Sequence, residues 1–553
     1  MKMSGARAIV ECLREQGVDT VFGYPGGTIL PLYDALCDSP VRHILTVHEQ
    51  GAAHAADGYA RASGRVGVCI ATSGPGATNL VTGLAAAFMD SIPMVAITGQ
   101  VPTTLIGRDA FQEIDITGIT MAVTKHNFLV KDPAKLADTI RYAFRIARSG
   151  RPGPVLIDVP RDVQTSDVFF EPAPPPEKVP WAIPGQVLSR IEAAAGAISA
   201  AKRPVIITGG GAISAEAQNQ VRQLAEKLNI PVVSTLMGLG SFPASHPQFL
   251  GLTGLHGLKP ANNAVYEADV IIAVGSRFSD RVTGDRAGYA AGKTVIHIDV
   301  DPAEIDKNVA AHIGLTGDMK TILGFLLERL TPGGDAAWGA KVRQWQLEHD
   351  VEYATDRLTA PWIFSQIAEQ TAGMPCIFVT DVGQHQMWAA QHLKIEKPRT
   401  WITSGGLGAM GFGLPAALGA QLAEPQKRVI AIAGDGGFKM TGAELFTIAS
   451  HQLPVILVII NNQGLGMIRQ LQKVFFANRY TACELPQQTD FTLFAAAFGV
   501  HATAAGSWQE FAQAFATALA SPQPEVIVAN VAAEDMVSPM TPPGGAINAY
   551  IDI

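Results

Sequence analysis

The chain has 553 residues, too many for one hydrophobic core, and its length predicts about two to four domains. Its composition, 48% hydrophobic and 16% charged, is typical of a large globular enzyme and excludes a disordered chain. The net charge of −8 provides no basic footprint for nucleic acid or for an anionic membrane surface.

The N-terminal segment and the cysteines indicate a cytoplasmic protein. Residues 1–27 predict an amphipathic helix that leads into a strand, and their charges interrupt any signal-peptide core. No apolar run approaches the roughly 20 residues of a membrane span. Because no two cysteines form a C-x-x-C pair, we expect reduced thiols rather than a zinc site or a disulfide framework. The cysteines are Cys12, Cys37, Cys69, Cys376 and Cys483.

Apolar runs alternate with helical stretches along almost the whole chain. The runs are continuous rather than alternating, which is typical of parallel strands covered by helices on both faces. We therefore predict an α/β fold with doubly wound parallel sheets, formed more than once. The runs are VGVCIATSG, IPMVAITGQ, PVLIDVP, RPVIITGGG, DVIIAVGS, TVIHIDVD, CIFVTDVGQ, VIAIAGDGG, LPVILVIINN and EVIVANV.

Two breaks in this pattern predict domain boundaries. The proline-rich segment 169–185 cannot lie inside a sheet and predicts an extended linker. The segment LTPGGDAAWG (330–339), followed by a charged helical stretch to about residue 356, predicts a second boundary. The expected domains are residues 1–168, 186–330 and 357–553.

Two buried-strand runs in the third domain end in short polar residues. The run VIAIAG is followed by Asp435, and the run LPVILVII is followed by Asn461 and Asn462. Ligands of open parallel sheets bind beyond the carboxyl ends of the strands, where a carboxylate and an amide oxygen suit Mg²⁺ that holds a diphosphate. Gly434, Gly436 and Gly437 would let backbone N–H groups approach that diphosphate. A tight turn would be enough to explain the G-D-G motif if it stood alone. The N-N motif after the next apolar run favours the metal site instead.

G-D-G followed by N-N at this separation resembles the thiamine-diphosphate binding motif. The rest of the chain resembles the catalytic large subunit of acetohydroxyacid synthase (acetolactate synthase) over nearly its whole length. This set of motifs is far more specific than any one of them. The matching stretches are FGYPGG, HEQGAAHAADGYAR, ATSGPGATNL, DSIPMVAITGQVP, DAFQEID, TKHNFLV, SGRPGPVLIDVP, TDVGQHQMW, TSGGLGAMGFGLPAA and GDGGF…INN.

The resemblance implies a role for each matching residue of the cofactor site. Glu49, in VHEQG, would hydrogen-bond the aminopyrimidine ring and shift it to the imino tautomer, whose imino nitrogen removes the thiazolium C2 proton. We expect this carboxyl group to be buried, with a raised pKa. Met410, in GAMGFG, would wedge between the two cofactor rings, although a methionine alone is more often core filler. The implied Mg²⁺ ligands are Asp435, Asn462 and the Gly464 carbonyl, and the further cofactor contacts are the Gly408 carbonyl, His385 and Gln386.

Members of the same family bind FAD in their central domain, although this FAD has no obvious redox role in the reaction. A glycine-rich turn after a strand also suits a dinucleotide on physical grounds, although TGGG alone fits a tight strand–helix turn equally well. The positions that the resemblance assigns to FAD are Arg151, Gly209, Gly210, Gly211, His256, Arg277, Asp299 and Asp318.

The second substrate is expected to be held by its carboxylate. Arg281 matches the arginine assigned that task, since guanidinium binds carboxylate bidentately. The alternative is a surface arginine paired with Asp280. Phe111 and Gln112 would line the same pocket. The chain departs from the family at Leu471, where tryptophan favours 2-ketobutyrate in many members, and further departures are Leu252, Leu255, Arg161 and Ser279.

The resemblance implies an enzyme dependent on FAD, Mg²⁺ and thiamine diphosphate, with pyrimidine-binding, FAD-binding and diphosphate-binding domains in chain order. It would decarboxylate pyruvate and add the hydroxyethyl carbanion to a second 2-keto acid, giving 2-acetolactate and 2-aceto-2-hydroxybutyrate for valine and isoleucine biosynthesis. The active site would lie between subunits of a homodimer or tetramer. The sequence does not decide whether a separate small regulatory subunit also binds. The alternatives are an FAD-free catabolic acetolactate synthase, a decarboxylase, a pyruvate oxidase, or a non-catalytic FAD-binding or regulatory module.

Overall fold

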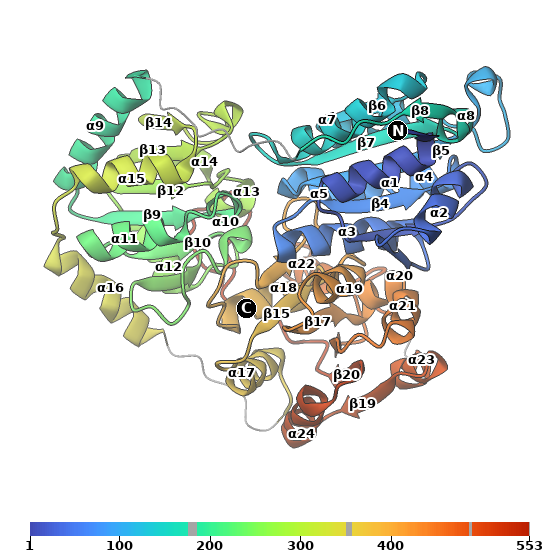
Figure 1. The fold of residues 1–553 in the computed structure, drawn as a ribbon. Helices are drawn as coiled ribbons and strands as arrows, with labels where there is room; N and C mark the ends of the chain where they lie inside the picture. The colour runs from blue at the N-terminus through green and yellow to red at the C-terminus, as the bar shows by residue number, and fades with distance from the viewer. Residues whose placement is uncertain (175–184, 350–356, 486–488, 552–553) are drawn as a thin grey trace.

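The computed structural model describes residues 1–174, 185–349, 357–485 and 489–551, and it contains three bodies of similar build (Figure 1). Each body holds a six-stranded sheet in which all neighbouring strands run parallel, with helices against both faces. This confirms the predicted α/β class with three doubly wound sheets. The strands of each sheet lie within one predicted domain. The boundaries themselves stay predictions, because 175–184 and 350–356 lie outside the described residues.

The N-terminal domain has the strand order β3-β2-β4-β5-β7-β6. A separate antiparallel pair, β1 (Lys2–Ser4) and β8 (Asp167–Phe169), ties the chain start to the end of this domain. The strands are β2 (Thr20–Tyr24), β3 (Arg42–Leu45), β4 (Gly67–Ala71), β5 (Met94–Gln100), β6 (His126–Leu129) and β7 (Pro154–Pro160). The main helices are α1 (Gly5–Glu15), α2 (Leu30–Cys37), α3 (Glu49–Ser63), α5 (Val81–Asp90) and α7 (Leu136–Arg148).

The central domain has the strand order β11-β10-β9-β12-β13-β14. Its strands are β9 (Pro204–Thr208), β10 (Val232–Ser234), β11 (Phe249–Leu252), β12 (Val270–Val274), β13 (Thr294–Asp299) and β14 (Ile313–Thr316). Its main helices are α9 (Gly185–Ala200), α10 (Gly210–Ser214), α11 (Gln218–Leu228), α12 (Lys259–Glu267) and α15 (Met319–Arg329), and α16 (Ala336–Glu348) follows.

The C-terminal domain has the strand order β16-β15-β17-β18-β20-β19. Its strands are β15 (Cys376–Thr380), β16 (Trp401–Thr403), β17 (Arg428–Gly434), β18 (Ile456–Asn461), β19 (His501–Ala505) and β20 (Glu525–Asn530). Its helices are α17 (Ala360–Gln370), α18 (Gln384–His392), α19 (Gly413–Ala423), α20 (Asp435–Thr441), α21 (Leu445–Ser450), α22 (Gly466–Phe475), α23 (Phe491–Ala497) and α24 (Trp508–Ala520).

Small residues let the N-terminal and C-terminal domains pack closely within one chain. Helix α3 crosses α19 so tightly that a Cβ atom on Gly58 would clash with the Ala416 carbonyl group. A Cβ atom on Gly419 would likewise clash with the Ala55 carbonyl group. This crossing joins the two domains through a shared apolar core and fixes the start of α3 against the C-terminal domain.

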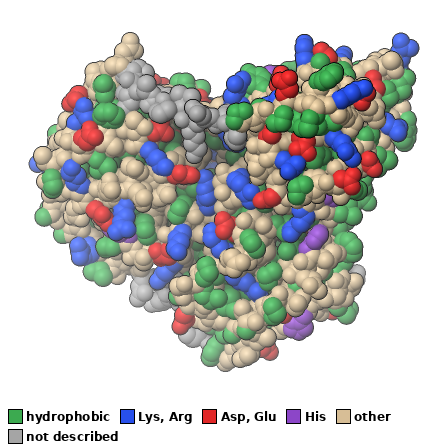
Figure 2. Space-filling model, in the orientation of Figure 1, with side chains coloured by type: hydrophobic (Ala, Val, Ile, Leu, Met, Phe, Trp, Pro, Cys, Tyr) green, Lys and Arg blue, Asp and Glu red, His purple; other side chains and the backbone are tan. Residues whose placement is uncertain are grey.

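No helix among the described residues is both long and apolar enough to cross a bilayer. Acidic and basic side chains are interspersed over the face of the molecule shown in Figure 2.

Candidate active site

The two predicted metal-binding side chains lie at one edge of the C-terminal sheet. Asp435 follows β17 and opens α20, and Asn462 directly follows β18, the neighbouring strand. Asp435 is buried, and its carboxylate accepts hydrogen bonds from the backbone N–H groups of Gly436 and Gly464. Burial raises the pKa of Asp435 to about 6, because desolvation disfavours the charged form. A cation at this carboxylate would offset that desolvation.

The surroundings of Asn462 leave its amide oxygen for a ligand. Its Nδ2 donates to Gln384 Oε1 at 3.0 Å, and Gln384 Nε2 donates in turn to Gln470 Oε1 at 2.9 Å. Among the described residues, no three His, Cys, Asp or Glu side chains gather into a metal-binding group. One carboxylate, one amide oxygen and a backbone carbonyl form a donor set that fits Mg²⁺, which fills its remaining positions with phosphate oxygens and water.

His385 and Gln386 lie in the first turn of α18 beside this edge, and both are buried. A Cβ atom on Gly434 would lie 2.9 Å from His385 Nδ1, so the imidazole lies against the G-D-G turn. Burial lowers the pKa of His385 to about 4, which keeps the ring neutral, and its Nε2 has no hydrogen-bond partner among the described residues. Gln386 Nε2 donates to Thr403 Oγ1 at 2.7 Å.

The segment 404–413, which we call the Met410 loop, joins β16 to α19 beside the G-D-G turn. Gly408 has a φ of 68°, a left-handed conformation that favours glycine. A Cβ atom on Gly436 would lie 3.6 Å from Met410 Cε, so Met410 reaches the edge that carries Asp435.

Asp381, which sequence reasoning missed, holds the end of the Met410 loop. Its carboxylate accepts hydrogen bonds from the backbone N–H groups of Gly411 at 3.1 Å and Gly413 at 2.9 Å. Burial raises the pKa of this carboxyl group. The available signal was the same as for Asp435, a buried apolar strand that ends in aspartate.

Glu49, the residue predicted to contact the aminopyrimidine ring, is the first residue of α3. It is buried as expected, and Asn79 Nδ2 donates to its Oε2 at 2.9 Å. Glu444 of the C-terminal domain accepts the N–H groups of Val47 and His48 at 3.1 and 3.2 Å and so fixes the start of the helix. Among the described residues, no hydrogen bond or ion pair joins Glu49 to Asp435.

Among the described residues, no hydrogen bond or ion pair joins the side chains of the predicted acceptor-pocket residues to those of the predicted cofactor residues. The Arg281 side chain is 70% exposed, and its Nε lies 3.7 Å from Asp280 Oδ2, as in the alternative interpretation. Phe111 is 87% exposed, and Gln112 has a φ of 60° in the same loop. Their roles as substrate contacts stay predictions.

The predicted FAD residues lie around the carboxyl edge of the central sheet. Gly209 and Gly211 pack so closely against Gly275 that a side chain on either would clash with its backbone. Burial raises the pKa of Asp299 to about 6. Asp318 accepts the Thr321 N–H at 2.8 Å as the N-cap of α15.

Polar atoms without partners at this edge fit a bound ligand. The Nε2 atom of His256 and the Oε2 atom of Glu304 are buried without a hydrogen-bond partner among the described residues. Burial lowers the pKa of His256 to about 4. Arg151 Nη1 lies 2.6 Å from Glu304 Oε1 and so links the N-terminal and central domains, and Arg277 Nη1 donates to the Met89 carbonyl group across the same boundary.

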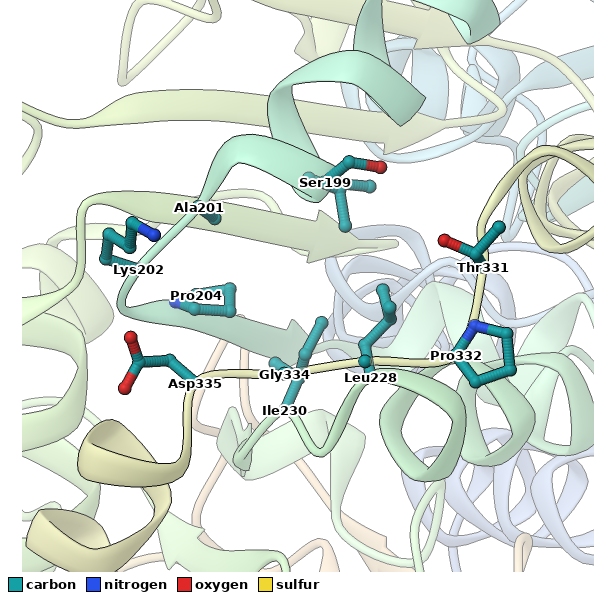
Figure 3. Close-up of a pocket in the computed structure, with 12 residues that line it drawn as sticks. Ser199, Ala201, Lys202, Pro204, Leu228, Ile230, Thr331, Pro332, Gly334 and Asp335 are labelled. Atoms are coloured by element: carbon teal, nitrogen blue, oxygen red, sulfur yellow. The ribbon is translucent and has the colours of Figure 1, made fainter.

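A pocket of about 240 Å³ lies at the opposite end of the central sheet (Figure 3). Its lining includes Pro204, the first residue of β9, together with Lys202 and Asp335. The pocket therefore lies at the amino ends of the strands, away from the glycine-rich turn at their carboxyl ends. It belongs to neither predicted cofactor site.

Known proteins match this chain over nearly its whole length. Family models described as Thiamine pyrophosphate enzyme match residues 3–119 (N-terminal TPP binding domain), 191–326 (central domain) and 381–529 (C-terminal TPP binding domain). The acetolactate synthase isozyme 2 large subunit of Escherichia coli (strain K12) is 46% identical over 557 residues, 100% of each chain. The acetolactate synthase large subunit of Parasynechococcus marenigrum (strain WH8102) is 47% identical over 561 residues, 98% of this chain and 90% of the relative. The probable acetolactate synthase large subunit of Methanocaldococcus jannaschii is 46% identical over 574 residues, 99% of this chain and 95% of the relative.

Proposed function

We propose how catalysis is divided among the residues of this chain, which belongs to the acetolactate synthase large-subunit family of thiamine-diphosphate-dependent enzymes. The chain decarboxylates pyruvate and adds the two-carbon unit to a second 2-keto acid, giving 2-acetolactate for branched-chain amino acid biosynthesis. Thiamine diphosphate, when bound, supplies the electron sink that decarboxylation requires.

Asp435, Asn462 and the Gly464 carbonyl would hold Mg²⁺ and, through it, the diphosphate. The observation that carries this proposal is the position of Asp435 and Asn462 at the ends of neighbouring strands, with the Asn462 amide nitrogen already bonded to Gln384. Glu49 would hold a proton at a ring nitrogen of the aminopyrimidine, and its burial supports that role. Met410 would support the bent cofactor from the edge of the same sheet.

FAD would bind at the carboxyl edge of the central sheet. The glycine-rich turn after β9 and the unpartnered His256 Nε2 and Glu304 Oε2 atoms support this assignment. Arg281 would bind the carboxylate of the second substrate, with Phe111 and Gln112 beside it. The exposure of Arg281 and Phe111 in the single chain supports a pocket that is completed only by the bound ligands and a second subunit.

The active site would be assembled from two copies of this chain. Apolar side chains are exposed around the start of α3, where Glu49 lies, and Val47 and Leu45 are joined to the C-terminal domain there by hydrogen bonds to Glu444 and Thr447. Contiguous exposed apolar surface is typical of a protein interface. We define the Leu45–Phe446 patch as Leu45, Val47 and Phe446, which are 46%, 38% and 51% exposed.

Two further features concern partners and location. The relatives are named large subunits, which supports a smaller partner subunit for this chain. All five cysteines are free, which supports a reducing compartment such as the cytoplasm.

The direct test is to identify the product formed from pyruvate by the purified chain. Thiamine diphosphate, Mg²⁺ and FAD are supplied together and then withheld one at a time. We expect 2-acetolactate, lost without thiamine diphosphate or Mg²⁺, with no net oxidation of pyruvate. Acetaldehyde as the main product would indicate a decarboxylase, and acetyl phosphate or acetate with consumption of oxygen would indicate an oxidase. Full activity without FAD would remove the proposed FAD site.

A further inference from the structure

A carboxylate from the N-terminal domain holds the beginning of the Met410 loop. Asp90, the last residue of α5, accepts the backbone N–H of Gly406 at 2.7 Å and that of Gly405 at 3.1 Å. Asp381 holds the other end of the loop, through Gly411 and Gly413. Gly408 and Met410 therefore lie between two carboxylate anchors, one from each domain.

Arg61, in the last turn of α3, fixes Asp90 and binds the strand from which the loop begins. Its Nη2 lies 2.9 Å from Asp90 Oδ2, and its Nη1 donates to the Thr403 carbonyl at 2.9 Å. Asp57 binds the other side of the guanidinium group. All three charged side chains are almost fully buried, with exposed fractions of 6% for Arg61 and 0% for both aspartates. A buried network of this kind keeps one geometry, because any unpaired member would be costly.

The same helix also contacts the far end of the loop. Phe412 lies between His54, whose ring is edge-on with a centroid distance of 5.3 Å, and Arg61, whose Cζ lies 5.3 Å from the ring centroid. Neither ring nitrogen of His54 has a hydrogen-bond partner among the described residues, so His54 acts here as a packing group. Helix α3 thus touches the loop directly at Phe412, after Met410, and reaches its beginning through Asp90 and Thr403.

We propose that Asp90, held by Arg61, is a positioning residue that sets the Met410 loop against the thiamine-diphosphate site. The inference rests on the proposed role of Met410. Helix α3 then has two tasks, since it presents Glu49 at its first turn and anchors the Met410 loop through Arg61 at its last. A displacement of about 1 Å in such a support can lower the rate roughly 10²-fold.

The test compares Asp90→Asn with Asp57→Asn. Both changes remove one charge from the same buried network, but only Asp90 binds the loop backbone. We expect both variants to lower the melting temperature similarly, whereas kcat falls about 10–100-fold in Asp90→Asn and stays within about twofold in Asp57→Asn. The near-ultraviolet circular dichroism of bound thiamine diphosphate should change only in Asp90→Asn. Equal loss of kcat in the two variants would reduce Asp90 to a structural role and overturn the proposal.

A double-mutant cycle with Met410→Ala shows whether Asp90 acts through the loop. We expect the double variant to be no slower than Met410→Ala alone, and fully additive losses would contradict the proposal. Gly406→Ala provides a second route if Asp90→Asn does not fold, since its Cβ would lie 2.7 Å from Asp90 Oδ1 and would disturb the contact between loop and carboxylate without removing a charge. It should reproduce the Asp90→Asn kinetics, and unchanged kinetics would count against the anchor.

Failure of the proposed function gives a different result. Wild-type kcat and cofactor affinity in Met410→Ala would remove the role of Met410 itself. An impaired Met410→Ala beside a fully active Asp90→Asn would overturn only the positioning role of Asp90.

Discussion

The carboxyl edge of the C-terminal sheet and the acceptor region around Arg281 differ in how complete they are within one chain. At the C-terminal edge, Asp435 and Asn462 are buried and bonded to neighbours that fix their orientation. Around the acceptor region, Arg281 and Phe111 project into solvent. The side chains of the first region are therefore fixed within one chain, whereas those of the second are exposed in it.

Glu49 belongs to a third region of the predicted site, at the start of α3. The residue is buried and held by Asn79, yet no hydrogen bond or ion pair among the described residues connects it to the Asp435 group. Its helix instead starts beside the Leu45–Phe446 patch of exposed apolar residues. The comparison therefore predicts one preformed half-site for the diphosphate and one for the aminopyrimidine, which meet across a subunit interface.

Glu49→Gln should have the largest effect on activity. Glutamine keeps the shape of the side chain and a hydrogen bond with Asn79 but cannot exchange a proton with the aminopyrimidine. We expect kcat to fall about 10²–10⁴-fold, the usual contribution of general acid–base catalysis, with an unchanged melting temperature. Steady-state assays with pyruvate measure the loss. Turnover close to that of the wild type would remove Glu49 from the mechanism.

Asp435→Asn should weaken cofactor binding more than it alters folding. The carboxylate is the only charged side chain in the proposed Mg²⁺ site, so the Kd for thiamine diphosphate should rise at least about 10–100-fold, a range typical even for groups that only orient metal ligands. Titration at several Mg²⁺ concentrations measures this. Asp490→Asn, at an exposed helix start in the same domain, is the control and should leave the Kd unchanged. Equal affinities and equal Mg²⁺ dependence in the Asp435 variant would mean that G-D-G is only a turn.

Leu471→Trp should change the choice of acceptor substrate rather than cofactor binding. Leu471 is half-buried on α22, and a tryptophan at this position would offer the extra methylene of 2-ketobutyrate a rigid aromatic surface that leucine lacks. A methylene contact changes specificity by roughly 10–200-fold at most. Competition between the two keto acids should give more 2-aceto-2-hydroxybutyrate with the variant. An unchanged product ratio would show that Leu471 does not line the acceptor pocket.

Asp318→Ala should have the smallest effect and separates two roles for one residue. The loss of the α15 N-cap should cost about 0.5–2 kcal/mol of unfolding free energy. Asp318→Ser retains a capping oxygen and should recover most of that stability. If Asp318 also contacts FAD, both variants should bind FAD more weakly. If FAD affinity falls in Asp318→Ala but returns with stability in Asp318→Ser, Asp318 acts only as a helix cap and does not contact FAD.

The parts of the fold that were predictable are those encoded in neighbouring residues. The ten continuous apolar runs all form strands, and Asp435 and Asn462 could be placed at one sheet edge because each follows such a run. All six edge strands, β3, β6, β11, β14, β16 and β19, and the inner strand β10 were missed, since these segments are only three to five residues long and most mix polar with apolar residues.

Contacts between the domains could not be predicted in this way. Asp90 and Gly405 are 315 positions apart, and they meet only because α3 packs on α19 through glycines. The contact of Glu444 with the start of α3 has the same origin. No local periodicity encodes such a pairing.

Complementation between two inactive variants tests most directly the claim that the site is shared between subunits. Glu49→Gln and Asp435→Asn chains with different affinity tags are co-expressed, and mixed dimers are isolated by purification on both tags. A shared site predicts roughly half of the wild-type activity in the mixed dimer, because one of its two sites keeps both residues. Mixed dimers as inactive as either parent would contradict the account and place Glu49 and Asp435 of each site in the same chain.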